Sequence, residues 1–320
     1  MFKQKKEKEK IENKKRKVSS KLIFGILAVI LIAIFCIAMT PVTLQNDTFY
    51  TIKIGEQITE TGIDMQDHFS WHEDLAYTYP HWLYDLITYY IYATFGMTGI
   101  YVTTCILSAI LGISLYIVNT KIAKNQLISF ILTAVVIYII RGYIAARAQL
   151  VTFILFVWII YFIEMFLKNR KIRYAVGLVV ISTLIANLHV AVWPFIFVLF
   201  LPYIAEYLIA IIADLAIYRK INIKLMKIAI KLLTKSGKYV DKKQKLEEKL
   251  QKILGKNEKI KIKREEDLKN PYKIRLQKNP NVKWLILVMV ICAFTGLLTP
   301  WEIHHIRICI KQCKEIQLKI

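Results

Sequence analysis

The run LIFGILAVILIAIFCIAM, residues 22–39, decides the fold of this chain because it contains no charged or strongly polar side chain. A transmembrane helix needs about 20 predominantly apolar residues. The basic segment before the run is long, and no small-residue cleavage site follows it, so we read a retained span rather than a signal peptide. The 320-residue chain is 56% hydrophobic, which argues against an ordinary soluble domain and predicts a polytopic membrane protein.

Six further apolar runs approach the length of a span. The segment 82–95 is short, rich in tyrosine and contains Asp85, so we interpret it as an interfacial aromatic helix rather than a span. The sequence therefore predicts an all-α, polytopic transmembrane helix bundle of about seven spans, with an external loop, 40–97, of short interfacial helices. After 22–39, the predicted spans are 98–118, 127–140, 150–167, 174–188, 191–217 and 284–299.

The net charge of +22 is concentrated in two blocks, residues 1–21 and 218–283. If the segment 82–95 does not cross the membrane, all basic loops fall on one face of the membrane, which is the positive-inside pattern. We therefore predict a multi-pass protein of the plasma membrane with a cytoplasmic N-terminus and a cytoplasmic loop at 218–283, helical or mobile. Within that loop, the amphipathic stretch KLMKIAIKLL (224–233) fits an anionic lipid surface, and a solvated positive loop is the alternative. Membrane lipids are the expected partners and nucleic acid is not, although binding of nucleic acid by the second block is a further alternative. The sequence does not indicate the oligomeric state.

Asp47 follows the first span by eight residues and falls on the predicted external face. A carboxylate there can act as a general base on an acceptor hydroxyl, or it can bind a divalent cation such as Mg²⁺ or Mn²⁺ through its oxygen atoms. The alternative is an exposed loop acid or a helix N-cap, because Asp47 and Thr48 stand at the start of the helical pattern TFYTIKIGEQI.

The stretch from 62 to 85 mixes acids and histidines with aromatic residues, and Asp67, His68 and His72 are its candidate substrate-binding residues. Aromatic rings stack on sugar faces and carboxylates bind sugar hydroxyls, so this mixture favours a carbohydrate site. An aromatic belt at the level of the lipid headgroups is the alternative. No spacing here matches a strong metal signature.

Two arginines, Arg141 and Arg147, stand between two spans on the face that lacks the basic blocks. Guanidinium groups bind phosphate in a fork, so a phosphate or diphosphate partner explains them; contact with lipid phosphates is the alternative. Asn187 and His189, two further candidate substrate-binding residues, end another apolar run. Polar groups at membrane depth usually face a cavity or a neighbouring helix, and helix packing is the simpler role for a lone histidine.

The order of these motifs resembles polytopic bacterial membrane proteins of the GT-C glycosyltransferase-like class. The resemblance covers roughly residues 20–217 and 284–300. It implies an integral-membrane enzyme that uses a polyprenyl-phosphate-linked sugar, with the acid of the first external loop, Asp47, as the catalytic or metal-binding residue. The family pattern often has Arg-Pro before the span, whereas here Ala148 follows Arg147. The motifs are NDTFYTIKIGEQITETG (46–62), DHFSW (67–71), PHWLYD (80–85), FGMTG (95–99), RAQ (147–149) and ANLH (186–189).

The tail 301–320 is polar and irregular, forming neither a span nor a domain pattern. We interpret it as a frameshifted end, which predicts a longer natural protein. The stretch HHIRICIKQC (304–313) has metal-ligand residue types, but a frameshift explains it without a metal.

The leading hypothesis is a GT-C-like transferase that moves a sugar from a lipid-phosphate-linked donor to an acceptor at the external face. The alternatives are a non-catalytic membrane protein, such as a lipid-precursor transporter or an assembly scaffold, and an inactive truncated product. An enzyme requires Asp47 and the arginines to converge at the external surface. A transporter would instead place charged groups along a path through the bilayer midplane.

Overall fold

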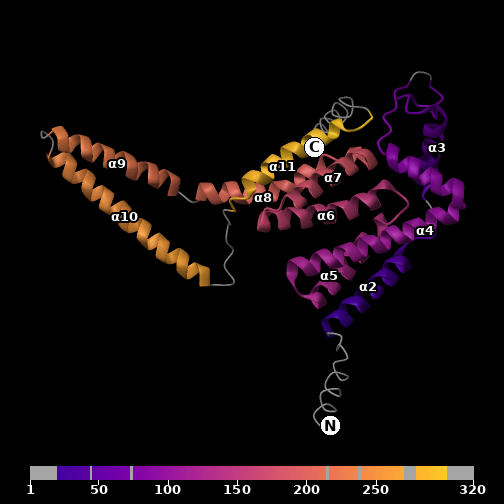
Figure 1. Ribbon diagram of the computed structural model, residues 1–320, viewed down its shortest axis with the longest axis horizontal. Coiled ribbons are helices and arrows are strands. Elements are labelled where there is room, and N and C mark those ends of the chain that lie inside the picture. The colour runs from indigo at the N-terminus through magenta and orange to yellow at the C-terminus, as the bar shows by residue number, and fades with distance from the viewer. Residues whose placement is uncertain are drawn as a thin grey trace, which may run out of the picture. The chain divides into compact units, whose positions relative to one another are not determined.

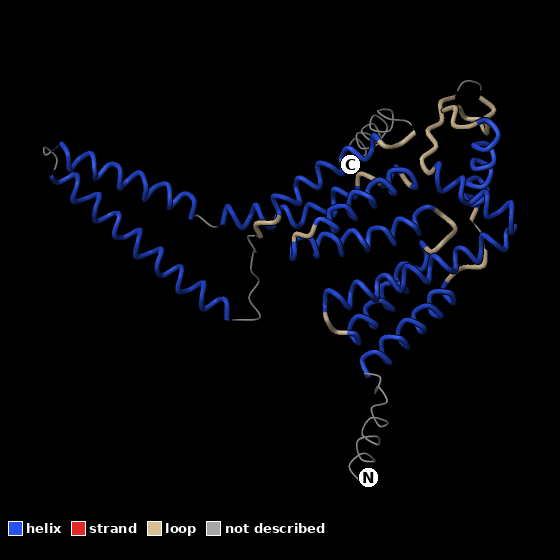
Figure 2. Tube along the Cα trace, viewed as in Figure 1, coloured by secondary structure: helices blue, strands red, loops and turns tan. Residues whose placement is uncertain are grey.

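Every regular element that the structure describes is a helix. The computed structural model describes residues 20–43, 45–72, 75–213, 216–236, 240–269 and 279–300 (Figure 1). Over these residues the chain is helices joined by loops, with no strand beyond one isolated bridge between Gln66 and Ala76 (Figure 2). The all-α membrane helix bundle predicted from the sequence is confirmed. The segments 1–19 and 301–320, including the predicted frameshifted tail, lie outside the described residues.

Among the described residues, five helical segments are long and apolar enough to cross a membrane, and two further apolar helices are shorter. Each of the seven predicted spans corresponds to one of these segments. An apolar run in lipid becomes a helix because only a helix satisfies the backbone hydrogen bonds of a single segment. The long segments are α2 (Ser20–Met39), α4 (Trp82–Ala123), α5 (Gln126–Ile140) with η1 (Arg141–Tyr143), α6 (Ala148–Asn169), and η2 (Val190–Val192) with α8 (Phe195–Ala213); the shorter ones are α7 (Ile172–Leu188) and α11 (Val282–Phe294) with η3 (Thr295–Leu297).

Large apolar side chains on α2 face outward, as expected for a helix that contacts lipid. Leu22, Ile26, Ile30 and Ile34 are each about half exposed, although such residues are usually buried in soluble proteins. Exposed apolar surface on this scale is stable where lipid replaces water. The chain is therefore a membrane protein, in contact with lipid through its apolar helices.

Helix α4 contains a break at Gly96, where φ is 61° and ψ is −160°. This conformation is open to glycine and strongly disfavoured for residues with a Cβ. The break separates 82–95, the segment that we predicted to be interfacial, from the apolar part of the helix. Helix α3 (Asn46–Thr61) packs against 82–95, so these two short helices make up the helical part of the predicted external loop.

Small residues and hydroxyl groups allow the apolar helices to approach closely. Gly112 of α4 lies against α2, since an added Cβ there would stand 2.4 Å from the sulfur of Cys36. Ser108, one turn earlier, donates a hydrogen bond of 3.2 Å to the carbonyl oxygen of Cys36. Small residues and interhelical hydrogen bonds are the usual means of helix association in membranes.

A second hydroxyl cluster joins α7 to η3. The hydroxyl groups of Ser182 and Thr295 lie 2.7 Å apart, and the indole N–H of Trp193 lies 3.2 Å from each. The ring of Trp193 also packs on Gly296, where an added Cβ would be 2.9 Å from the ring. The end of α7 and the region of η3 are thereby held together beside η2.

The chain divides into two compact units, and each is described by itself. The first comprises Met1–Leu199 together with Trp284–Ile320, and the second comprises Phe200–Lys283. Besides part of α8, the second unit contains α9 (Ala216–Ser236) and α10 (Val240–Lys269), which pack against each other. These two helices account for most of the basic block 218–283.

Candidate functional site

The N-termini of α3 and α6 meet in the first unit. The hydroxyl of Thr48, fully buried in the first turn of α3, donates a hydrogen bond of 3.3 Å to the carbonyl oxygen of Ala146. Arg147, the next residue, is the N-cap of α6, and Asp47 lies in the first turn of α3. Each helix N-terminus carries unpaired N–H groups and a partial positive charge. The junction therefore favours negatively charged groups.

Asp47 and Arg147 form an ion pair at this junction, although 100 residues separate them in sequence. The Nη2 atom of Arg147 lies 2.6 Å from the Oδ2 atom of Asp47. The Asp47 side chain is 64% exposed and the Arg147 side chain 37% exposed, so both groups are accessible from outside. The Nε atom of Arg147 is buried and has no hydrogen-bond partner among the described residues. The guanidinium thus holds one carboxylate oxygen and keeps unused N–H donors.

Arg141 occupies a different place from Arg147. It begins η1, and its guanidinium carbon lies 4.4 Å from the centre of the Tyr138 ring, a cation–π contact. Its side chain is exposed at the end of an apolar segment. The structure therefore brings Asp47 together with Arg147, while Arg141 stacks on its own helix.

A buried polar cluster lies one helical turn along α3 from the ion pair. Asp85 is only 1% exposed, its Oδ1 atom makes no hydrogen bond within the described part of the chain, and its carboxyl group interacts with Thr51, four residues after Asp47. The Nδ1 atom of His81 is 3.6 Å from Asp85 Oδ1, and the rings of His81 and His189 are 5.2 Å apart between centres. Residues four apart share one helix face. Helix α3 therefore carries Asp47 of the ion pair and Thr51 of the buried cluster on the same side.

His189 joins this cluster to α6. Its Nδ1 atom lies 3.0 Å from the hydroxyl of Thr152, which is five residues beyond Arg147. His189 itself stands between α7 and η2. Burial, with a smaller contribution from the charge of His81, lowers the pKa of His189 to about 4. The ring is therefore neutral at neutral pH and serves as a hydrogen-bonding group rather than a cation.

Asn187 fixes the position of Trp82, the first residue of α4. Its side-chain oxygen accepts a hydrogen bond of 3.2 Å from the indole N–H of Trp82. Its amide nitrogen donates to the carbonyl oxygens of Thr183 and Leu298. Asn187 thus makes the helix-packing contacts that polar groups at membrane depth usually make.

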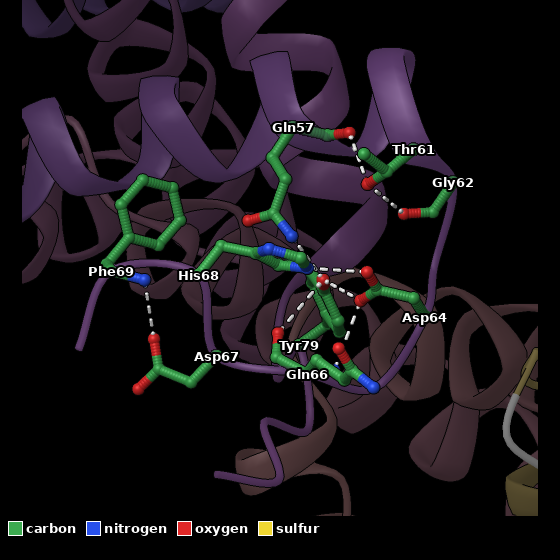
Figure 3. A network of polar contacts seen from close by, with 9 residues as sticks. All are labelled: Gln57, Thr61, Gly62, Asp64, Gln66, Asp67, His68, Phe69 and Tyr79. Atoms are coloured by element: carbon green, nitrogen blue, oxygen red, sulfur yellow. Dashed lines mark hydrogen bonds and ion pairs between the residues drawn. The ribbon is translucent and has the colours of Figure 1, made fainter. Parts of the chain in front are cut away.

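The loop after α3 is organised by the buried hydroxyl of Tyr79 (Figure 3). This hydroxyl donates to Asp64 Oδ1 and accepts from the side-chain amide of Gln57, both at 2.8 Å. The Nε2 atom of His68 contacts the other oxygen of Asp64. Partial burial acts to raise the pKa of Asp64, but hydrogen bonds from the Gln66 amide, His68 and Tyr79 outweigh it and leave the pKa below its usual value.

The remaining candidates of the loop make local contacts. Asp67 Oδ1 accepts hydrogen bonds from the backbone amides of Phe69 and Ser70, at 2.9 and 3.1 Å, and so caps a turn. His72 stacks against Trp71, with the ring centres 3.8 Å apart, and the Trp71 side chain is 87% exposed. A protruding indole with an adjacent imidazole is suited to stacking on a sugar ring.

The donor set of the described residues does not fit a divalent cation. No group of three or more His, Cys, Asp or Glu side chains able to hold a metal occurs among them. At Asp47, a cation would compete with the guanidinium of Arg147 for the same carboxylate oxygen.

In the sequence, Asp85 was only a mark of an interfacial segment, and His81 and Thr152 were not candidate site residues. The spacing of His81 and Asp85, four residues apart at the start of a helix, is a signal that would have paired them. Thr152 carries no such signal, because its contact with His189 depends on how α6 and α7 are arranged.

Comparison with known proteins adds no relative to this description: no family model, no curated protein and no solved structure matches the chain.

Proposed function

We propose that this protein is an integral-membrane glycosyltransferase of the GT-C-like type, which moves a sugar from a polyprenyl-phosphate-linked donor to an acceptor at the external face of the cell membrane. The observation that carries the proposal is the exposed pair of Asp47 and Arg147 where the N-termini of α3 and α6 meet. A base and a phosphate-binding group are the two functions that this transfer requires, and the pair supplies both.

Arg147 binds the phosphate of the donor. Its guanidinium presents five N–H donors in a planar fork that matches phosphate oxygens. Within the described part of the chain, its terminal nitrogens engage one ion-pair partner, Asp47. The N-termini of α3 and α6 add partial positive charge on the same side, and such termini commonly bind phosphate groups.

Asp47 acts as the general base. Its carboxylate takes the proton of the acceptor hydroxyl while the acceptor oxygen bonds to the anomeric carbon of the sugar. The bond between that carbon and the phosphate oxygen breaks, and the leaving group is the polyprenyl phosphate. Arg147 stabilises the negative charge that develops on this phosphate. Since the donor set does not fit a divalent cation, no step is assigned to a metal.

The ion pair explains why Arg147 binds the donor phosphate before Asp47 accepts a proton. Without substrate, each neutralises the other at an exposed surface. A phosphate in bidentate contact with Arg147 competes with the carboxylate for the guanidinium. Donor binding would then free Asp47 to accept a proton.

The direction of the protein in the membrane follows from its charge. The basic blocks 1–21 and 218–283 are placed on the cytoplasmic face by the positive-inside rule. An odd number of crossings later, Asp47 lies on the external face, and so does Arg147.

The test is a membrane assay with polyprenyl-phosphate sugars, in which the parent protein is compared with Asp47→Asn and Arg147→Gln. We expect transfer by the parent and a loss on the order of 100-fold or more in Asp47→Asn, as for removal of a general base. Glu60→Gln is the matched control, because Glu60 is an exposed acid at the other end of α3. Equal turnover in Asp47→Asn and Glu60→Gln would remove Asp47 from the mechanism. A parent with no transfer from any such donor would overturn the activity itself.

A further inference from the structure

Charge is divided unequally between the two paired helices α9 and α10. Helix α9 carries six basic residues and no acidic one. All seven acidic residues of the block 218–283 lie in α10, where basic residues accompany them. Lys243 and Glu247 form one such pair, at 3.9 Å and spaced four residues apart. Mixed charge at this spacing is typical of a solvated helix, whereas a purely basic helix attracts anionic partners.

Helix α9 has two apolar rows rather than one. Side chains of the first row, Ile223, Met226, Ile230 and Leu233, are half-buried, in keeping with the packing of α9 against α10. The second row consists of Leu225, Ile228 and Leu232, which are 57%, 48% and 63% exposed. These positions recur at three- and four-residue intervals and so form one stripe along the helix. Packing against α10 therefore leaves a continuous apolar stripe uncovered.

Exposed lysines border this second row. Lys224, Lys227 and Lys231 each precede one residue of the stripe, which places them beside it on the helix surface. Lysine stems cover apolar surface while their ammonium groups reach outward to charged groups. An apolar stripe with an adjacent row of lysines is the arrangement of a helix that lies in the headgroup region of a membrane.

The exposed face of α10 provides a contrast within the same unit. Lys245, Lys249 and Lys252 are exposed, and the exposed residue Glu248 lies among them. No large apolar side chain interrupts this part of the face. The face has the positive charge of α9 without its apolar stripe, so it suits water.

We infer that α9 lies on the anionic headgroups of the bilayer in which the protein is inserted, with Leu225, Ile228 and Leu232 directed into the acyl boundary. Chain connection supports this occupant. The apolar helix α8 ends at Ala213 and α9 begins at Ala216, so the end of α8 holds α9 near a membrane surface. Charge supports it too, because anionic lipids complement a helix without acids.

Amide hydrogen exchange of the full-length protein in nanodiscs tests the inference. One set of discs contains phosphatidylcholine only, and the other contains about one third phosphatidylglycerol, an anionic lipid. We expect the amides of 222–234 to exchange more slowly in the anionic discs, by on the order of tenfold, and this slowing to weaken in high salt. Amides of α10 serve as the internal reference.

Three triple variants separate the stripe from the charge. Leu225→Gln, Ile228→Gln and Leu232→Gln together remove the apolar stripe, and Lys224→Gln, Lys227→Gln and Lys231→Gln together remove the lysine row. Both should lose the slowing. Lys245→Gln, Lys249→Gln and Lys252→Gln remove the same amount of charge from α10. This variant should still show slower exchange of the α9 amides in the anionic discs. Glutamine retains helix propensity, and circular dichroism checks that each variant is still helical.

Three results would overturn the inference. One is equal exchange of α9 in the two kinds of disc. Another is loss of the slowing in the α10 variant to the same extent as in the α9 lysine variant, which would mean unspecific attraction. The last is slower exchange of the α9 amides when an RNA oligomer is added to neutral discs, together with no effect of phosphatidylglycerol. That result would identify nucleic acid as the partner of α9.

Discussion

The contact between α3 and the start of α4 depends on Gly55, and Gly55→Ala tests it. A Cβ at this position would stand 2.2 Å from the carbonyl oxygen of Asp85 and 2.5 Å from the Cβ of Tyr89. Ordinary contact begins at 3.4 Å, so the two helices must separate by about 1.2 Å. The nearest atom belongs to the backbone, so no change of rotamer relieves the contact. Overpacking of this kind costs about 1–3 kcal/mol.

The same displacement would reach the candidate site, because α3 carries Asp47 and Thr51 as well as Gly55. If the proposed function is correct, a shift of about 1 Å in a reacting group lowers transfer on the order of 100-fold. Transfer should therefore fall in Gly55→Ala by more than its loss of folded protein explains.

The assay is thermal unfolding in detergent, together with transfer per folded molecule. Gly142→Ala is the matched control, because no heavy atom lies within 4 Å of a Cβ added there and its φ is not positive. We expect a lowered unfolding midpoint in Gly55→Ala and an unchanged one in Gly142→Ala. If the two variants unfold at the same temperature, the close approach of α3 to α4 is wrong.

Three further predictions each concern a single residue. Trp193→Phe removes the N–H that contacts Ser182 and Thr295 and also the part of the indole ring that packs on Gly296, so stability should fall by more than about 1 kcal/mol, and an unchanged unfolding midpoint would contradict these contacts. The lowered pKa of Asp64 means that its contribution to stability is present above about pH 4 and is lost as the pH falls through that lowered pKa. Pepsin should therefore cleave the loop 62–72 faster at the lowest pH, and Asp64→Asn should abolish this pH dependence relative to the parent; a parallel pH response of the two would be evidence against it. Gly255→Ala places a better helix former at an open position in α10, so the opening free energy of that helix should rise by about 0.5–1 kcal/mol and its amides should exchange more slowly. Faster exchange would speak against a helix there.

The helices could be predicted from the sequence because their signal is local and strong. Each of the seven predicted runs, from 22–39 to 284–299, corresponds to a helical segment, since an apolar segment in lipid has few other ways to satisfy its backbone hydrogen bonds. Helix ends were less certain: the predicted span 191–217 is observed as η2 followed by α8, which ends at Ala213. Such differences arise at helix ends, where the apolar pattern fades gradually.

The site could be predicted only as far as topology allows. Charge placed Asp47, Arg141 and Arg147 on one predicted face, but it could not say which arginine approaches Asp47. The choice depends on η1, which stacks Arg141 on Tyr138, and on the start of α6, which presents Arg147. Burial of Asp85 was equally hidden, because it depends on the packing of α3 against α4, where Gly55 approaches the backbone of Asp85.

The break at Gly96 has a consequence for hydrophobic mismatch. A continuous helix of the length of α4, 42 residues, would measure about 63 Å, twice the hydrocarbon thickness of about 30 Å. Such a helix would have to tilt steeply, thin its surroundings or draw its tyrosine-rich start into lipid. With the axis interrupted at Gly96, the part from Met97 to Ala123 measures about 40 Å, close to the full width of a bilayer with its headgroups. The backbone conformation of one residue, Gly96, therefore separates a helix of bilayer length from the tyrosine-rich start that carries the buried Asp85.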